Sequence, residues 1–348
     1  MTSTPTRPIL AGLAAASALT VAASVLVATP AQAAGFTSAV LGVSTNFSAG
    51  GGSCSITSGG ASSQNVPFTS NGAKVTRTIN NTAVVTDAGD ASDFTNLTSK
   101  STGTARSTQS GGQLKTVSLS QQGTVKVDPN QGSGTDCASA AQATSTVSGV
   151  FTLTKAQVLD LRATHAGLGT LAQLQILSAS GSVSVEVSVG FSGSLHRVFY
   201  LPADDYQIIL VGATTLNAPE VSSDPTTRTT STSMEGTFSK PGSAADKQVG
   251  TAAKYLKLGK SLNCSGKLLK STFKSAAGKK PKKGKTGPVR TAQFKVNGKK
   301  AKTFKKPYRG FKAKVKKLPT QQPVLVEVTL TLKNGTKLYA RRSYQPCS

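Results

Sequence analysis

The chain has 348 residues, of which 37% are hydrophobic and none is tryptophan, and it carries 40 Lys and Arg against 14 Asp and Glu. This length permits about two domains, and the composition excludes a collagen, a coiled coil and a polytopic membrane protein. Residues 35–240 carry 11 basic and 12 acidic side chains, whereas residues 241–348 carry 28 basic side chains with Asp246 and Glu327 as the only acids. The sequence therefore predicts two dissimilar parts, one neutral and one strongly basic, and it does not specify a function.

Residues 1–34 have the features of a signal peptide. Arg7 precedes an apolar stretch from Ile9 to Val27, and a run of small residues ends at Ala34. The apolar stretch is long enough to span a bilayer, so an uncleaved anchor is the alternative. We expect cleavage near Ala34 or Gly35, no membrane span afterwards, and an extracellular protein that is either released or associated with the cell wall.

The neutral part, residues 35–238, reads as a series of short strands. Apolar and polar residues alternate between Gly, Asn, Asp and Ser, most clearly at 115–120, 181–190 and 206–211. This period of two is typical of half-buried strands. Residues 155–162 have helix propensity, but they follow the strand-like 150–154, which favours a strand. These patterns predict a neutral β-sandwich domain over 35–238.

Residues 239–253 lack a periodic apolar pattern and are predicted to form a linker to a basic domain over 254–348. Within that domain, Asn-Gly pairs at 297–298 and 334–335 interrupt apolar alternation, which predicts two β-hairpins. The Gly, Pro and Lys run at 278–285 predicts an exposed loop. The predicted fold class is all-β, with two antiparallel β-sandwich domains in tandem after the signal peptide.

The four cysteines are divided equally between the two parts of the chain. Because an exported protein reaches an oxidising compartment, we expect disulfides, and among three connectivities the segregation favours Cys54–Cys137 and Cys264–Cys347. No two cysteines lie close together in sequence, which argues against a metal site.

Two segments resemble known bacterial modules at the level of fold. The run Leu201-Pro-Ala-Asp-Asp-Tyr-Gln-Ile-Ile-Leu-Val resembles the strand entry of secreted jelly-roll modules, including the pre-peptidase C-terminal type, although Asp204-Asp205 replace the usual Gly. Residues 149–153 and 177–181 fit earlier strands of that pattern. Residues 294–298 and onward to 342–347 resemble small immunoglobulin-like sandwiches on exported proteins of high-GC Gram-positive bacteria. The resemblance implies non-catalytic adaptor modules and supplies no function.

Candidates for catalysis are few. His165 and His196 are the two histidines, and neither lies in a nucleophile elbow or a metalloprotease motif. A glycosidase pair would need Asp204 or Asp205 together with Glu186 or Glu220. We expect no catalytic residue and no enzyme activity, with a secreted hydrolase of envelope glycan, its site in the neutral domain, as the alternative.

Three carboxylates at Asp87, Asp90 and Asp93 are a weak calcium candidate. Carboxylate oxygens suit Ca²⁺, but the spacing and the closing Glu of an EF-hand are missing. The alternative is a turn in which the Asp side chains accept hydrogen bonds from nearby amides. No other cofactor is expected.

The positive charge of the basic part predicts contact with a polyanion, because it exceeds what solubility requires. Aromatic residues between the cations either stack on a ligand or point into the core, and the second is favoured. We therefore predict a non-catalytic protein that binds an anionic polymer of the cell envelope or matrix, with a cationic inhibitor or antimicrobial effector as a further alternative. The predicted polyanion-binding residues form a loop group and a strand group, namely Lys279, Lys280, Lys282, Lys283 and Lys285, then Lys305, Lys306, Arg309, Lys312, Lys314, Lys316 and Lys317.

Overall fold

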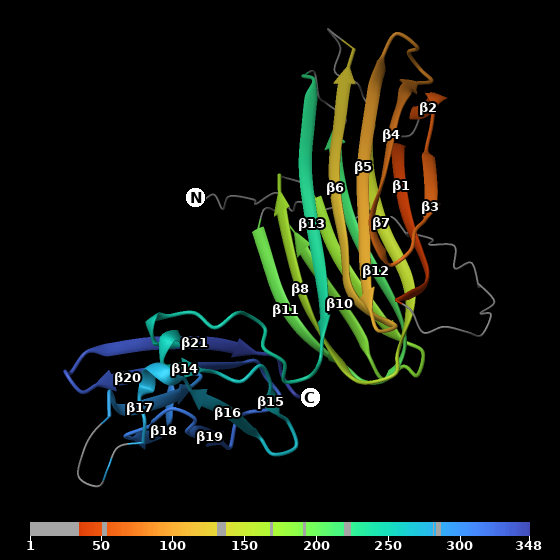
Figure 1. The fold of residues 1–348 in the computed structure, drawn as a ribbon. Coiled ribbons are helices and arrows are strands. Elements are labelled where there is room, and N and C mark those ends of the chain that lie inside the picture. The colour runs from red at the N-terminus through yellow and green to blue at the C-terminus, as the bar shows by residue number, and fades with distance from the viewer. Residues whose placement is uncertain are drawn as a thin grey trace, which may run out of the picture. The chain divides into compact units, whose positions relative to one another are not determined.

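A computed structural model describes residues 35–50, 54–130, 137–167, 170–190, 193–218, 224–280, 282 and 287–348. The predicted signal peptide, residues 1–34, lies outside the described residues. The described part of the chain is built almost wholly from antiparallel strands (Figure 1). It contains no helix with the length and apolar character needed to cross a membrane.

The strands before residue 240 form two sheets in the described residues. One has the order β10-β9-β12-β7-β1-β3, and the other the order β11-β8-β13-β6-β5-β4-β2. The strands of the first sheet are β1 (Phe36–Gly50), β3 (Ser62–Pro67), β7 (Ala138–Leu153), β9 (Thr170–Ser178), β10 (Ser184–Gly190) and β12 (Asp204–Ala218). Those of the second are β2 (Cys54–Gly59), β4 (Asn71–Asp87), β5 (Phe94–Ser110), β6 (Gln113–Pro129), β8 (Gln157–Ala166), β11 (Gly193–Leu201) and β13 (Thr226–Ser239).

The interior between these sheets is apolar at both ends and polar in the middle. Along β6, the inward-facing Leu119 belongs to one hydrophobic cluster and Val125 to another. Gln121 and Gly123 lie between them, and on β12 Thr214 occupies the same level. Gln121 donates to the Thr214 hydroxyl at 3.2 Å. The interior between the two sheets therefore contains a buried polar belt between two hydrophobic clusters.

The strands after residue 250 form two smaller sheets around a third hydrophobic cluster. In the described residues one has the order β18-β17-β20-β21, and in the other β16 pairs with β14, β15 and β19. The strands are β14 (Leu256–Lys257), β15 (Leu262–Asn263), β16 (Leu268–Phe273), β17 (Val289–Val296), β18 (Lys299–Lys305), β19 (Lys312–Lys316), β20 (Val324–Leu332) and β21 (Lys337–Tyr344). Two short 3-10 helices, η1 (Thr251–Lys254) and η2 (Ser275–Ala277), flank β14 and β16.

The all-β class and the antiparallel pairing are confirmed, and residues 157–166 form the favoured strand. The first Asn-Gly corner is a tight turn in which Asn297 and Gly298 have φ of 47° and 77°, as a two-residue hairpin requires. The second corner is longer, because Leu332 donates its amide to the carbonyl of Thr336 at 2.9 Å. The sheets divide near residue 240, but all described residues belong to one compact unit, so the predicted domain boundaries stay a prediction.

Both expected disulfides are present. Cys54 is bonded to Cys137, and Cys264 to Cys347. Each crosslink closes a loop of 83 residues, which the chain-entropy description values at roughly 4–5 kcal/mol at most. Structural disulfides fit a protein of an oxidising, extracellular compartment.

Candidate cation-lined surface

The strand β19 presents three lysines on one face. Lys312, Lys314 and Lys316 are exposed, while Ala313 and Val315 between them are buried in the hydrophobic cluster. This is the period-two alternation expected of a strand with one side on a core. The sequence prediction of an exposed cationic strand is thus compatible with the observed burial pattern.

Pairing with β16 adds lysines that the sequence prediction missed. Lys270 lies directly opposite Lys314, with Thr272 opposite Lys312 and Leu268 opposite Lys316. At the end of this pair of strands, Leu318 donates its amide to the carbonyl of Lys267 at 3.0 Å, which brings Lys267 beside Lys317. We call six exposed residues the lysine ladder: Lys267, Lys270, Lys312, Lys314, Lys316 and Lys317.

The lysine ladder has no acidic counterpart in its own sheet. Asp246 accepts a hydrogen bond from the Ser343 amide at 2.9 Å, and Glu327 lies on β20 opposite Lys295 and Arg341. The ion pairs found within the described residues all lie in the neutral part, between residues 126 and 196. The repulsion between the paired lysines is therefore not relieved inside the sheet.

Two of the remaining predicted cations, Arg309 and Lys280, lie near the start of β19. Arg309 donates its amide to the carbonyl of Gly278 at 2.8 Å, which connects the turn before β19 to the residues that precede Lys279 and Lys280. The ammonium of Lys280 lies 5.9 Å from the centre of the Tyr308 ring. Lys279, Lys282, Lys305 and Lys306 are exposed, and Lys283 and Lys285 lie outside the described residues.

Two of the three aromatic residues between these cations, Phe304 and Phe311, pack against the core, whereas Tyr308 is half-buried and lies beside Phe311 and Lys280. Phe304 packs edge-on against Phe294 and Phe311 at ring separations of 5.5 and 5.6 Å, and Phe311 also contacts Phe273. Phe304 and Phe311 are half-buried against the hydrophobic cluster. The ladder face therefore carries cations without an aromatic platform.

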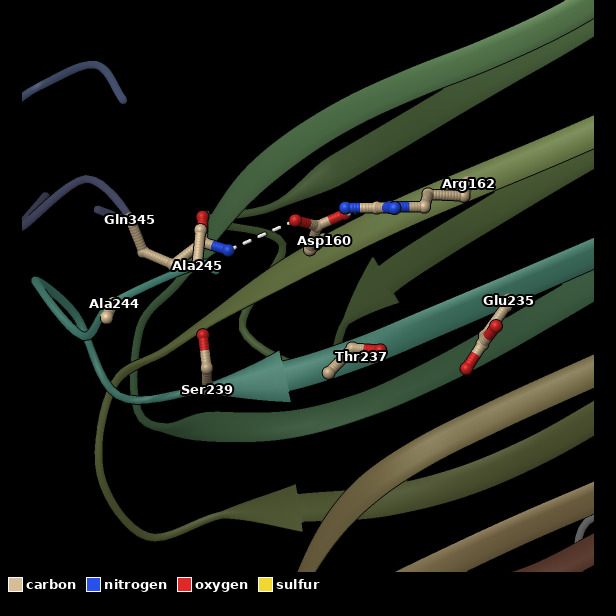
Figure 2. A pocket seen from close by; sticks show the side chains of 8 residues that line it. All are labelled: Asp160, Arg162, Glu235, Thr237, Ser239, Ala244, Ala245 and Gln345. Atoms are coloured by element: carbon tan, nitrogen blue, oxygen red, sulfur yellow. Dashed lines mark hydrogen bonds and ion pairs between the residues drawn. The ribbon is translucent and has the colours of Figure 1, made fainter. Parts of the chain in front are cut away.

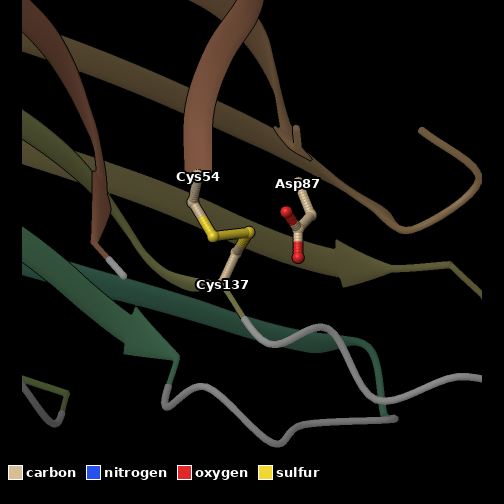
Figure 3. A group of neighbouring side chains, drawn as sticks. All are labelled: Cys54, Asp87 and Cys137. Atoms are coloured by element: carbon tan, nitrogen blue, oxygen red, sulfur yellow. A yellow bond between two sulfur atoms is a disulfide. The ribbon is translucent and has the colours of Figure 1, made fainter. Parts of the chain in front are cut away.

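The calcium candidate residues form turns. The carboxylate of Asp87 accepts from the Gly89 amide at 2.8 Å, and that of Asp90 accepts from the amide and hydroxyl of Ser92, which lowers the Asp90 pKa. Asp93 is buried, with its amide donating to the Asp90 carbonyl at 3.0 Å. Figure 3 shows Asp87 beside Cys54 and Cys137 instead. Because those sulfurs are bonded to each other, they provide no thiolate for a metal.

The two histidines lie on β8 and β11 but face different surroundings. His165 is 5% exposed, its Nδ1 lies 2.8 Å from the Thr232 hydroxyl, and burial lowers its pKa. His196 is exposed and its Nε2 lies 2.9 Å from the Asp160 carboxylate. The structure records no hydrogen bond between either histidine and a serine hydroxyl among the described residues.

Asp160 lines a cavity of about 240 Å³ with Arg162, Glu235, Thr237, Ser239, Ala244, Ala245 and Gln345. Figure 2 shows Arg162 directed toward Asp160. The side-chain amide of Gln345 donates to the Asp160 carboxylate at 3.1 Å. One Asp160 oxygen is 2.9 Å from His196 and 3.5 Å from Arg162, and the other accepts from Gln345. Asp160 thus acts as an acceptor shared by three side chains.

The carboxylates considered for the alternative glycosidase hypothesis bind separate partners. Asp204 accepts from Ser180, which lowers its pKa, while Asp205 accepts from Thr152 at 2.5 Å and Glu186 from Gln173 at 2.5 Å. Glu220 lies outside the described residues.

No family model matches the chain, and no curated protein matches it.

Proposed function

We propose that the chain is a secreted, non-catalytic protein whose basic part binds an anionic polymer of the cell envelope or matrix. The neutral part is then carried outward by that attachment. The observation that carries this proposal is the lysine ladder, in which Lys270 and Lys314 face each other and no acid lies in the same sheet.

Like charges placed directly opposite each other on neighbouring strands destabilise a sheet. A small domain is kept soluble by a net charge of roughly 2–8, so the excess carried by residues 241–348 exceeds that requirement several-fold. A bound polyanion relieves this repulsion, and the released counterions favour binding.

An extended partner fits this surface better than a small ligand. The cations run along β19 and β16 and continue to Arg309 and Lys280, and the core-facing side chains beneath them leave the charges on an exposed face. A polymer engages many such charges at once, which gives affinity from contacts that are individually weak.

Sedimentation of the mature protein with purified cell wall tests the proposal. We expect binding to intact wall in 50 mM salt, release in 500 mM salt, and loss of binding after the anionic polymers are extracted. Salt-insensitive binding to extracted wall contradicts the proposal and favours recognition of neutral glycan. Leakage of anionic vesicles at the same protein concentration, with no wall binding, favours the antimicrobial effector instead.

A further inference from the structure

We propose that the lysine ladder binds a single extended polyphosphodiester chain without bases, a polyol phosphate polymer, laid along β19. This inference rests on the proposed function and specifies the ligand class for the same surface. It is argued from four features of the ladder: its charge spacing, its pair of opposed lysines, the left-handed backbone at one end, and the absence of exposed rings on its face.

The spacing of the β19 lysines matches the repeat of a short polyol phosphate. Lys312, Lys314 and Lys316 alternate with buried residues, so successive charges stand about 7 Å apart along the strand. Six backbone bonds separate alternate Cα atoms, and six bonds also separate neighbouring phosphorus atoms joined by a three-carbon diol. An extended phosphate chain can therefore place one phosphate at each lysine without changing its repeat.

The β16 lysines widen the row into a shallow charged track. Lys270 lies opposite Lys314, so a phosphate bound between them accepts hydrogen bonds from two ammonium groups. Charge-assisted hydrogen bonds of this kind are stronger than those between neutral groups. A phosphate bound at this position therefore neutralises the two lysines that lie directly opposite each other.

The end of the track holds two lysines in a backbone conformation that favours glycine. Lys267 and Lys317 have φ of 45° and 60°, and both are exposed. The left-handed region is unfavourable for a residue that carries a Cβ. Glycine would adopt this conformation more easily, but it would remove a charge from the end of the track. Lys306, outside the ladder, has the same backbone conformation, so the conformation by itself does not mark the track.

The absence of an exposed ring on this face favours a chain without bases. Single-stranded nucleic acids gain much of their affinity from bases stacked on aromatic side chains. The outward residues of β16 and β19 are lysines, Thr272 and Leu268, whereas Phe304 and Phe311 pack toward the core. The track thus offers charge to a backbone and no platform to a base.

Synthetic phosphodiester oligomers test the inference with the full mature chain. Fluorescence anisotropy would compare oligomers with equal numbers of phosphates joined by three-carbon or twelve-carbon linkers, together with single-stranded DNA of the same phosphate number. We expect the three-carbon oligomer to bind at least about tenfold more tightly than the twelve-carbon oligomer in 0.1 M salt, because more of its phosphates contact ladder lysines at the same time. It should also bind at least as tightly as the DNA.

Two matched triple variants locate the site. Lys312→Gln, Lys314→Gln and Lys316→Gln together should abolish the spacing preference, while Lys254→Gln, Lys333→Gln and Lys337→Gln, which remove the same charge from exposed positions outside the ladder, should retain it. Circular dichroism of both variants confirms that each one is folded.

The outcomes separate the inference from the proposed function. No binding to any oligomer contradicts the proposed function itself. Equal binding of both linker lengths, or equal loss in both variants, leaves polyanion binding intact and overturns the polyol phosphate track. Tighter binding of DNA than of the three-carbon oligomer overturns it in favour of nucleic acid.

Discussion

Neutralising either member of the Lys270–Lys314 pair should stabilise the protein while weakening its binding to polyanions. The two lysines are directly opposed in the β16–β19 register, both are exposed, and their sheet contains no acid. Opposed like charges on neighbouring strands cost about 0.2–1 kcal/mol. We expect Lys314→Gln to raise the free energy of unfolding by an amount in this range in 20 mM salt.

A double-mutant cycle isolates the pair from the general repulsion of the basic part. Lys270→Gln, Lys314→Gln and the double variant are compared by urea unfolding, with Lys312→Gln as the matched control because Lys312 faces Thr272. The interaction energy between positions 270 and 314 should be unfavourable in 20 mM salt and should shrink in 1 M salt, where the Debye length is about 3 Å. Additive effects in 20 mM salt, or a destabilised Lys314→Gln variant with unchanged polyanion affinity, would refute the reasoning.

Three further predictions concern the neutral part and the disulfides. Burial lowers the pKa of His165 in the folded state. As the pH falls below about 6.5, the unfolded chain therefore takes up a proton before the folded chain does, and the free energy of unfolding should decrease until the pH reaches the folded-state pKa. His165→Gln should reduce this pH dependence in urea titrations. Gly123→Ala should lower the free energy of unfolding by about 1–3 kcal/mol, because a Cβ at this position meets the Thr214 hydroxyl and Gln121. Gly89→Ala, in an exposed turn, should change it by less than about 0.5 kcal/mol. Equal effects of the two substitutions in thermal unfolding would contradict close packing in the polar belt. Replacing Cys264 and Cys347 with Ser should lower stability by about 2–5 kcal/mol, and non-reducing peptide mapping should recover Cys54 with Cys137 and Cys264 with Cys347.

Local patterns predicted the strands well because alternation and turn residues act over short distances. The β19 alternation and the Asn297-Gly298 turn follow directly from neighbouring residues. The disulfide pairing also followed from the sequence. Two cysteines lie in the neutral part and two in the basic part, and the sheets separate near the same point of the chain.

Features that depend on strand register were missed. Lys270 joins the cationic face only because β16 pairs with β19, and no local pattern specifies that partner. The Asp160 acceptor site and the polar belt around Gln121 likewise combine residues from strands far apart in sequence. The alternation in 268–273 gave one usable signal, because it places Lys270 on the exposed side of a strand.

The salt dependence of polymer binding tests the central claim most directly. For the full mature protein and a single-stranded polyphosphodiester, the log-log slope of affinity against salt changes by about 0.7 for each phosphate contact. We predict that Lys312→Gln, Lys314→Gln and Lys316→Gln together flatten this slope by about 2, while Lys74→Gln, Lys100→Gln and Lys155→Gln in the neutral part leave it unchanged. Equal slopes for the wild type and the ladder variant, or a slope that flattens only when the lysines of the neutral part are removed, would contradict the account.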